Sequence, residues 1–141
     1  DQEREILDRM SRTAAAHAID AVMTPDAIAS ARELVDEIYI DDSIKDYVVS
    51  LVHATREPSA FGLEIDDLVD FGASPRATIN ITLAAKANAF LDGRGYVIPQ
   101  DVKDIAMQVL RHRVIVTYEA EAEEKTSEDI VQQILDHVPV P

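Results

Sequence analysis

The stretch Phe71–Arg76, which reads F-G-A-S-P-R, holds the residues of this chain best suited to chemistry. Ser74 can cap a helix, and Pro75 fits the first helical position, where its missing N–H costs nothing. The pattern therefore predicts that Arg76 lies in the first turn of a helix. Because a helix N-terminus attracts anions, an arginine beside it is well placed to hold a phosphate with its fork of donors. The alternative is a surface ion pair between Arg76 and a carboxylate, which contributes little to stability.

Other patterns of catalytic or metal-binding residues are absent from the sequence. It contains no glycine-rich phosphate loop of the G-x-x-x-x-G-K-[ST] type and no G-x-S-x-G elbow. The acidic runs Asp66-Asp67 and Glu119–Glu124 do not have calcium-loop spacing, so we interpret them as solvated charge and expect no metal site. The histidines lack the spacing of a metal pair and are predicted to be surface or packing residues; they are His17, His53, His112 and His137.

Composition and charge limit the kinds of partner. The chain has 141 residues, 47% of them hydrophobic, which suits one packed domain or a domain with a fragment of another. It has no cysteine, which excludes disulfides and fits a cytoplasmic protein, and no apolar run long enough to span a bilayer. The net charge of −14 opposes direct binding to nucleic acid or acidic lipids. Because the chain begins at Asp1 rather than Met, we expect a piece of a longer protein.

Apolar residues at helical spacing predict a mostly helical chain, with about five clear helices and one weaker helix near the N-terminus, over Glu3–His17. Capping residues mark the predicted ends of these helices. In chain order they are the start at Thr24-Pro25-Asp26, a capping box at Ser43-x-x-Asp46, the start at Ser74-Pro75, a glycine stop at Asp92-Gly93-Arg94-Gly95, and a capping box at Thr126-x-x-Asp129. On the helix after Ser74, the predicted buried stripe is Ile79, Leu83, Ala87, Phe90 and Leu91.

The segments between the helices are predicted to be short or solvated. Residues Ser59–Gly72 form a connection that is partly anchored by apolar side chains, and Glu119–Lys125 reads as a solvated acidic linker. Tyr96-Val97-Ile98 and the β-branched Val114-Ile115-Val116 are predicted to be extended. The fold class expected from these patterns is all-α, a bundle of about five to six helices with at most a very small β element.

Four stretches, in this order and spacing, closely resemble the C-terminal part of MoxR-type AAA+ ATPases. They are F-G-A-S-P-R-A (Phe71–Ala77), D-G-R-G-Y-V-I-P-Q-D-V (Asp92–Val102), V-L-R-H-R (Val109–Arg113) and H-V-P-V-P (His137–Pro141). The resemblance runs from about Thr24 to the end of the chain, and Glu3–Arg12 is similar to the helix that finishes the ATPase core. It implies that residues 1–22 belong to the end of the core or a linker, and that residues 23–141 form a helical lid.

The resemblance also implies a role for the A-S-P-R motif. Arg76 matches the sensor-two arginine, which reaches the terminal phosphates of the nucleotide, and Ser74 and Pro75 belong to the same nucleotide-binding motif. ATP and Mg²⁺ would be bound by the parent protein with phosphate-binding motifs upstream of this chain, so the chain alone would not hydrolyse ATP. The parent would form a homo-oligomeric ring that remodels or assembles a client protein. One departure is Ile98, where the family commonly has Thr or Ser, and the lost side-chain cap costs about 1 kcal/mol.

Two other functions are compatible with parts of the sequence. The chain could be a non-enzymatic acidic helical module that recruits a basic partner, with Arg76 merely structural. A helix–turn–helix or histone-like DNA binder could use the helix that starts at Pro99-Gln100-Asp101-Val102, but the charge balance argues against it. The cations Arg111, His112 and Arg113 suit a helix C-terminus and could equally face a neighbouring subunit.

Overall fold

The computed structural model describes residues 2–11 and 20–141, which separate into two compact units, Asp1–Ser30 and Ala31–Pro141. The first unit contains α1 (Gln2–Met10), whose Ile6 and Leu7 are exposed. The helix expected over Glu3–His17 is therefore confirmed as far as Met10. The remainder of that expectation, including His17, falls on residues 12–19 and lies outside the described residues.

Helix α2 (Pro25–Glu37) begins where the Thr24-Pro25-Asp26 pattern predicts. The N–H of Ala27 donates to the hydroxyl of Thr24 at 3.2 Å, so Thr24 is the side-chain cap. No residue of α2 is buried, and its apolar Ile28 and Leu34 are half exposed. The chain enters the core immediately after this helix, at Ile38 and Ile40.

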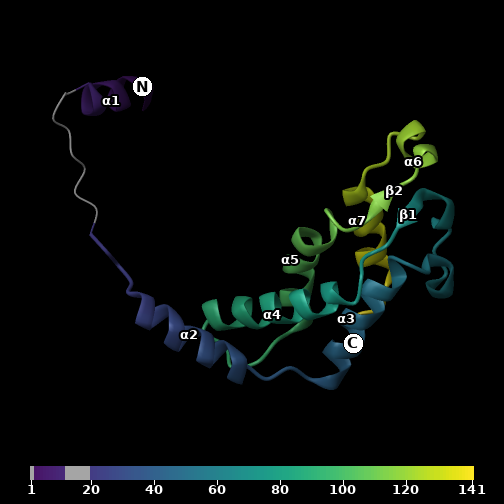
Figure 1. The fold of residues 1–141 in the computed structure, drawn as a ribbon, viewed down its shortest axis with the longest axis horizontal. Helices are drawn as coiled ribbons and strands as arrows, with labels where there is room; N and C mark the ends of the chain where they lie inside the picture. The colour runs from purple at the N-terminus through teal and green to yellow at the C-terminus, as the bar shows by residue number, and fades with distance from the viewer. Residues whose placement is uncertain (1, 12–19) are drawn as a thin grey trace. The chain divides into compact units, whose positions relative to one another are not determined.

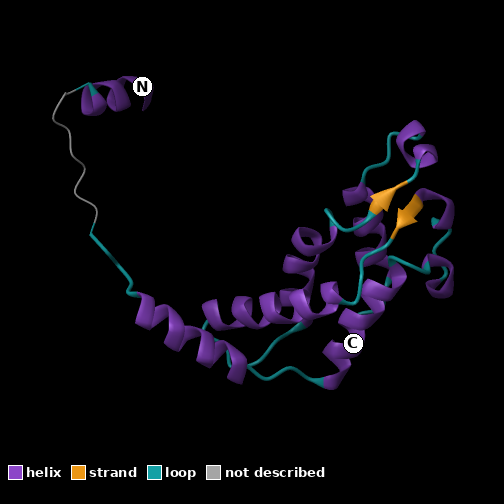
Figure 2. Cartoon of the chain, viewed as in Figure 1, coloured by secondary structure: helices purple, strands orange, loops and turns teal. Residues whose placement is uncertain are grey.

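The core of the second unit lies among its larger helices, which make up most of the ribbon in Figure 2. Helix α4 (Arg76–Leu91) packs against α3 (Asp42–Ala54) and α5 (Pro99–Leu110), and α7 (Ser127–His137) packs against both α3 and α5 (Figure 1). Leu51, Leu110 and Ile134 are among the fully buried side chains of this core. The second unit also contains α6 (Tyr118–Ala122) and the 3-10 turns η1 (Pro58–Phe61) and η2 (Asp66–Leu68).

Helix α4 buries a different face from the predicted one. Its buried residues are Ala77, Ile81, Ala85 and Ala89, spaced four apart. Of the predicted stripe, Ile79, Leu83 and Leu91 are exposed, whereas Phe90 is partly buried against the core. Three of the four buried residues are alanines, whose small side chains favour close packing of α4 with its neighbours. The prediction followed larger apolar side chains and missed the four-residue spacing of the buried face.

Two short strands form the only sheet in the described part of the chain, shown in orange in Figure 2. Strand β1 (Val69–Phe71) pairs antiparallel with β2 (Ile115–Val116), which confirms that the β-branched segment is extended. Tyr96 forms a single parallel bridge with Tyr39, so the short strand expected at Tyr96–Ile98 is reduced to this bridge.

The observed helix starts differ from the predicted ones in two places and agree with the prediction in a third. Helix α3 begins at Asp42 because the carboxylate of Asp41 accepts hydrogen bonds from both the N–H and the hydroxyl of Ser43, so the box predicted at Ser43 is wrong. The acidic linker predicted at Glu119–Lys125 is also wrong in part, since α6 forms there and buries Ala120. The capping box at Thr126 is confirmed: its hydroxyl accepts from the N–H of Asp129, whose carboxylate accepts from the N–H of Thr126.

The observed architecture confirms an all-α fold with a very small β element. Among the described helices, none combines the length and apolarity that a membrane span requires.

Candidate functional site

The A-S-P-R motif places Arg76 at the first residue of α4, in the predicted first turn. Pro75 already has helical dihedral angles (φ −56°, ψ −19°), and the turn closes through the backbone, with the N–H of Ala77 donating to the carbonyl of Ser74 at 2.8 Å. The hydroxyl of Ser74 makes no capping hydrogen bond, so the predicted side-chain cap is wrong. The conformation set by Pro75 is enough to start this helix.

Buried contacts with the end of α3 hold the segment that leads into α4. The N–H of Ala73 donates to the buried hydroxyl of Thr55 at 2.9 Å, and the guanidinium of Arg56 donates to the carbonyl of Ala73 at 3.0 Å. Gly72 lies so close to the end of α3 that a Cβ there would come within 2.2 Å of the Thr55 carbonyl oxygen. The roles of Thr55 and Arg56 could not be predicted from the sequence, because nothing local to them indicates a contact with Ala73, 18 and 17 positions away.

The side chain of Arg76 is exposed, and within residues 2–11 and 20–141 it makes no hydrogen bond or ion pair. The surface ion pair that was the alternative to a phosphate contact is therefore not formed within the described chain. A cation at a helix N-terminus is mildly unfavourable with respect to the helix dipole. The guanidinium is thus available to an anion supplied from outside these residues.

An apolar face continues from Arg76 along α4. Ile79 and Leu83 follow Arg76 by three and seven residues, which places all three on one side of the helix. Ile79 is 60% exposed and Leu83 is 50% exposed. They line a hollow of about 320 Å³ between α3 and α4 with four further residues, which are Lys45, Val49, Thr78 and Thr82. Arg76 therefore stands at the start of an unpartnered apolar helix face.

The far end of α4 is closed by the predicted glycine stop. Gly93 has a left-handed backbone (φ 72°), its N–H donates to the carbonyl of Phe90 at 2.9 Å, and the N–H of Arg94 donates to that of Ala89 at 2.9 Å. These two bonds make a Schellman motif, which a glycine in this position favours. The turn that follows leads directly into α5.

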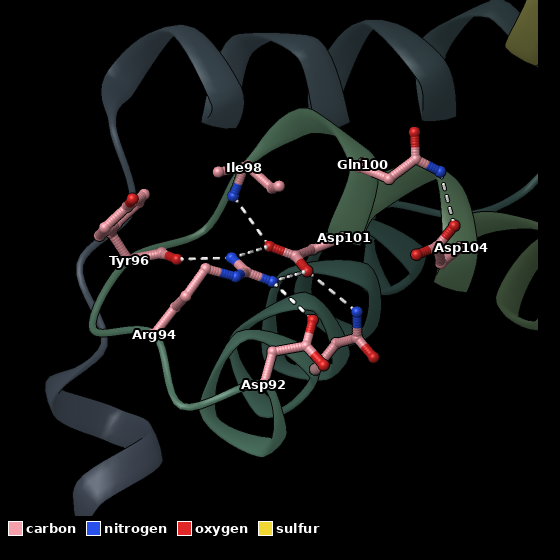
Figure 3. A network of polar contacts seen from close by, with 8 residues as sticks. Asp92, Arg94, Tyr96, Ile98, Gln100, Asp101 and Asp104 are labelled. Carbon is pink, nitrogen blue, oxygen red and sulfur yellow. Dashed lines mark hydrogen bonds and ion pairs between the residues drawn. The ribbon is translucent and has the colours of Figure 1, made fainter.

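A buried carboxylate joins this turn to α5 (Figure 3). Asp101 is 1% exposed, and its carboxylate accepts hydrogen bonds from both terminal nitrogens of Arg94, at 2.8 and 2.6 Å. The same carboxylate accepts hydrogen bonds from the side-chain amide of Asn88 at 2.9 Å and from the backbone N–H of Ile98 at 2.8 Å. The apolar side chain of Ile98 cannot cap α5, but the backbone N–H of Ile98 is hydrogen-bonded to Asp101. The sequence marks Asp101 only as part of the helix start at Pro99–Val102, and nothing near it indicates this network.

The network affects the ionisation of both charged partners. Burial acts to raise the pKa of Asp101, but the hydrogen bonds from Arg94, Ile98 and Asn88 outweigh it and leave that pKa below its ordinary value. The hydrogen bonds to Asp101 and Asp92 raise the pKa of Arg94 above its usual range. Because Asp101 is already engaged by four donors, we assign this network to fixing the α4–α5 connection rather than to binding a ligand.

The described histidines make structural contacts. His137 bonds through Nε2 to the carbonyl of Phe61 at 2.8 Å, and the ring of His53 lies edge-on to the Phe61 ring. His112 contacts Arg113, whose guanidinium also donates to the carbonyl of Val109. Within residues 2–11 and 20–141, no group of His, Asp or Glu side chains could hold a metal ion.

Comparisons with known proteins agree on the kind of domain. The family model of the AAA lid domain matches residues 63–134. The chain is 39% identical to "Chaperone MoxR1" of Mycobacterium tuberculosis over 100% of its own length and 37% of that protein. It is 32% identical to "Protein MoxR" of Methylorubrum extorquens, over 74% of the chain and 32% of that relative.

A solved structure shows the same fold. It belongs to a proposed ATPase from Cytophaga hutchinsonii and superposes with a TM-score of 0.90 at 36% identity, covering 99% of this chain and 42% of the other. The chain thus spans about two fifths of the length of the relatives that it matches from end to end.

Proposed function

The chain belongs to the AAA lid domain family, in the form found in MoxR-type AAA+ proteins, and on that premise we propose that it is the nucleotide-sensing lid of an ATP-hydrolysing remodelling protein. In this proposal residues 1–22 complete the ATPase core or link to it, and residues 23–141 form the lid. The parent protein would be a cytoplasmic, ring-forming ATPase that assembles or remodels a client protein, in keeping with a relative named as a chaperone.

The observation that carries the proposal is the position of Arg76. It begins α4, it is exposed, and within the described residues its guanidinium has no anionic partner. A guanidinium forms two parallel hydrogen bonds with phosphate oxygens, so it suits the terminal phosphate of ATP. Ser74 and Pro75 would contribute by setting the start of the helix close to the nucleotide.

The apolar face next to Arg76 supports docking of the lid against a core. Ile79, Leu83 and Val49 present an exposed apolar hollow, and a surface of this kind favours burial by another domain. Docking there would leave Arg76 at the edge of the contact, where it could reach a nucleotide held by the core. The core would supply the phosphate-binding motifs and hold Mg²⁺.

The proposed mechanism is a change in lid position when the terminal phosphate is lost. A charged hydrogen bond from Arg76 contributes about 1.5–3 kcal/mol. That free energy biases a two-state lid by about ten- to a hundredfold. It is too small to hold a nucleotide by itself, because micromolar affinity needs about 8 kcal/mol. Arg76 would therefore report the nucleotide state to the lid, and the core would provide most of the binding.

The decisive test is substitution of Arg76 in the full-length protein. Arg76→Ala should lower the rate of ATP hydrolysis about tenfold or more, because the contact with the developing phosphate charge is lost. Arg76→Lys should give an intermediate rate, since it keeps the charge and loses the two-pronged geometry. The control is Arg32→Ala, which removes another exposed arginine. Wild-type turnover in a folded Arg76→Ala protein would rule out the sensing role.

The alternative function is a non-enzymatic acidic module that recruits a basic partner. The net charge of −14 favours it. The two functions differ in their dependence on nucleotide: capture of a basic partner by this chain alone, unchanged by ATP and by Arg76→Ala, would favour the module. The same domain could perform both, because the acidic residues and Arg76 are different side chains.

A further inference from the structure

The ends of the small sheet carry three exposed apolar side chains. Phe71 and Ile115 are paired across β1 and β2, which puts them on the same face of the sheet, and they are 62% and 55% exposed. Tyr118, at the start of α6, is 86% exposed. Ile115 and Tyr118 help to line a hollow of about 420 Å³, together with Asp70, Val116, Thr117, Glu119 and Glu121. We call Phe71 and these lining residues the sheet-end surface.

The charged side chains that line the hollow have a single sign. They are Asp70, Glu119 and Glu121, and no lysine or arginine is among the lining residues. The cations that flank these segments in the sequence include Arg113, which donates to the carbonyl of Val109, and Lys125, which pairs with Glu123 at 2.8 Å. The charged lining of the hollow therefore suits a cationic ligand.

The sheet-end surface is held in place by backbone and core contacts. The hydroxyl of Thr117 donates to the carbonyl of Asp67 at 2.7 Å, and the N–H of Thr117 donates to that of Leu68 at 3.1 Å. The hydroxyl of Thr117 also accepts a hydrogen bond from the N–H of Ala120 and so caps α6, and the Ala120 residue is fully buried. Because these contacts order the surface in advance, little conformational entropy is lost when a partner binds.

We propose that the sheet-end surface binds a basic peptide segment of a partner protein, in which an apolar side chain is flanked by lysine or arginine. The apolar side chain would occupy the hollow beside Ile115 and Tyr118, and the flanking cations would face Asp70, Glu119 and Glu121. An exposed tyrosine in such a position is a typical anchor of a protein interface. The inference does not depend on nucleotide sensing, because the surface shares no residue with Arg76 or the hollow along α4.

The test uses labelled synthetic peptides and the 141-residue chain, with binding followed by fluorescence anisotropy and mapped by NMR. A short peptide of alternating Lys and Val should bind, with shifts concentrated in residues 69–71 and 115–121. The matching Glu and Val peptide should not bind, and a Lys and Ser peptide should bind at least about fivefold more weakly. Equal binding of the Lys–Val and Lys–Ser peptides would overturn the proposal, since it would indicate a diffuse charge effect.

Two substitutions separate the apolar and electrostatic contributions. Tyr118→Ala should weaken binding of the Lys–Val peptide about tenfold, whereas Tyr96→Ala, at another exposed tyrosine, should leave it unchanged. Reversing charge with Glu119→Lys and Glu121→Lys together should also weaken it about tenfold. The matched control reverses Glu33 and Glu37, two exposed acids of α2. If Tyr118→Ala and the control variants bind alike while all remain folded by circular dichroism, the surface is not the binding site.

Discussion

At the scale of single residues, Arg94 and Arg76 have opposite electrostatic environments. Arg94 is neutralised by Asp101 and Asp92 and forms part of a buried network. Arg76 lies at a helix N-terminus, where the dipole disfavours a cation, and has no anionic partner within the described residues. Arg76 differs from Arg94 in being exposed and unpaired within the described residues, which is compatible with the proposed contact to an anion of another domain or ligand.

Replacing Asp101 tests the buried network. Asp101→Asn should lower the free energy of unfolding by about 2–3 kcal/mol at neutral pH, because Arg94 loses a charged partner. Asp92→Asn, which changes the exposed partner of Arg94, should cost less than about 1 kcal/mol. Urea unfolding followed by circular dichroism measures both values. A cost for Asp101→Asn no larger than that for Asp92→Asn would contradict the assigned role.

The same network predicts a dependence on pH. Because the pKa of Asp101 is lower in the folded chain than its ordinary value of 3.8, its ionised form stabilises the fold above that pH. This stabilisation is lost as the pH falls through the lowered pKa. The difference in unfolding free energy between wild type and Asp101→Asn should therefore be constant near neutral pH and shrink below about pH 4. A difference that stays unchanged down to acid unfolding would contradict this account.

At the scale of elements, the junction between α3 and α4 determines where Arg76 stands. Thr55 and Arg56 at the end of α3 bind Ala73, and Gly72 fits against the Thr55 carbonyl with no room for a side chain. The Asp101 network secures the opposite end of α4. Helix α4 is thus held at both ends, and in the proposed function this would couple Arg76 to the rest of the lid.

Gly72→Ala should destabilise the chain by about 1–3 kcal/mol, because the added Cβ would overlap the Thr55 carbonyl and the backbone must shift. Gly95→Ala is the matched control, since the space around that position is open and its φ is not left-handed. The control should be neutral or stabilise slightly by restricting the unfolded chain. Thermal unfolding of both variants is the measurement, and equal melting temperatures would show that the junction tolerates a side chain.

At the scale of the whole molecule, the acidic charge and the partial coverage of the relatives both agree with the proposal that another domain holds most of the nucleotide site. The chain spans about two fifths of the relatives that it matches from end to end, and its net charge of −14 repels ATP. A lid of this charge needs cations from another domain before a nucleotide can settle against it. The apolar hollow along α4 is where such a domain is proposed to dock.

The isolated 141-residue chain is therefore expected to show no ATP hydrolysis and only weak ATP binding, because one guanidinium cannot supply the free energy of a nucleotide site. A phosphate-release assay and calorimetry on the purified chain measure both properties. Turnover above that of a heat-inactivated sample would contradict the proposal that catalysis belongs to the parent protein.

Features determined by neighbours in the chain could be read from the sequence. The cap at Thr24, the glycine stop at Gly93, the capping box at Thr126 and the place of Arg76 in its helix all depend on hydrogen bonds or dihedral preferences within a few residues. The family resemblance rested on motifs of this local kind, and the AAA lid model confirms it.

Features that depend on distant packing were decided only by the tertiary structure. The buried face of α4 contains Ala77 and Ile81 rather than Ile79, because the positions of the neighbouring helices α3 and α5 decide which apolar face of α4 is covered. The hydrogen bond between Ala73 and Thr55, and that between Asn88 and the buried Asp101, join residues 18 and 13 positions apart, and no periodicity marks these side chains. Periodicity identifies which residues can form an apolar face, and the shape of the neighbouring element selects which face is buried.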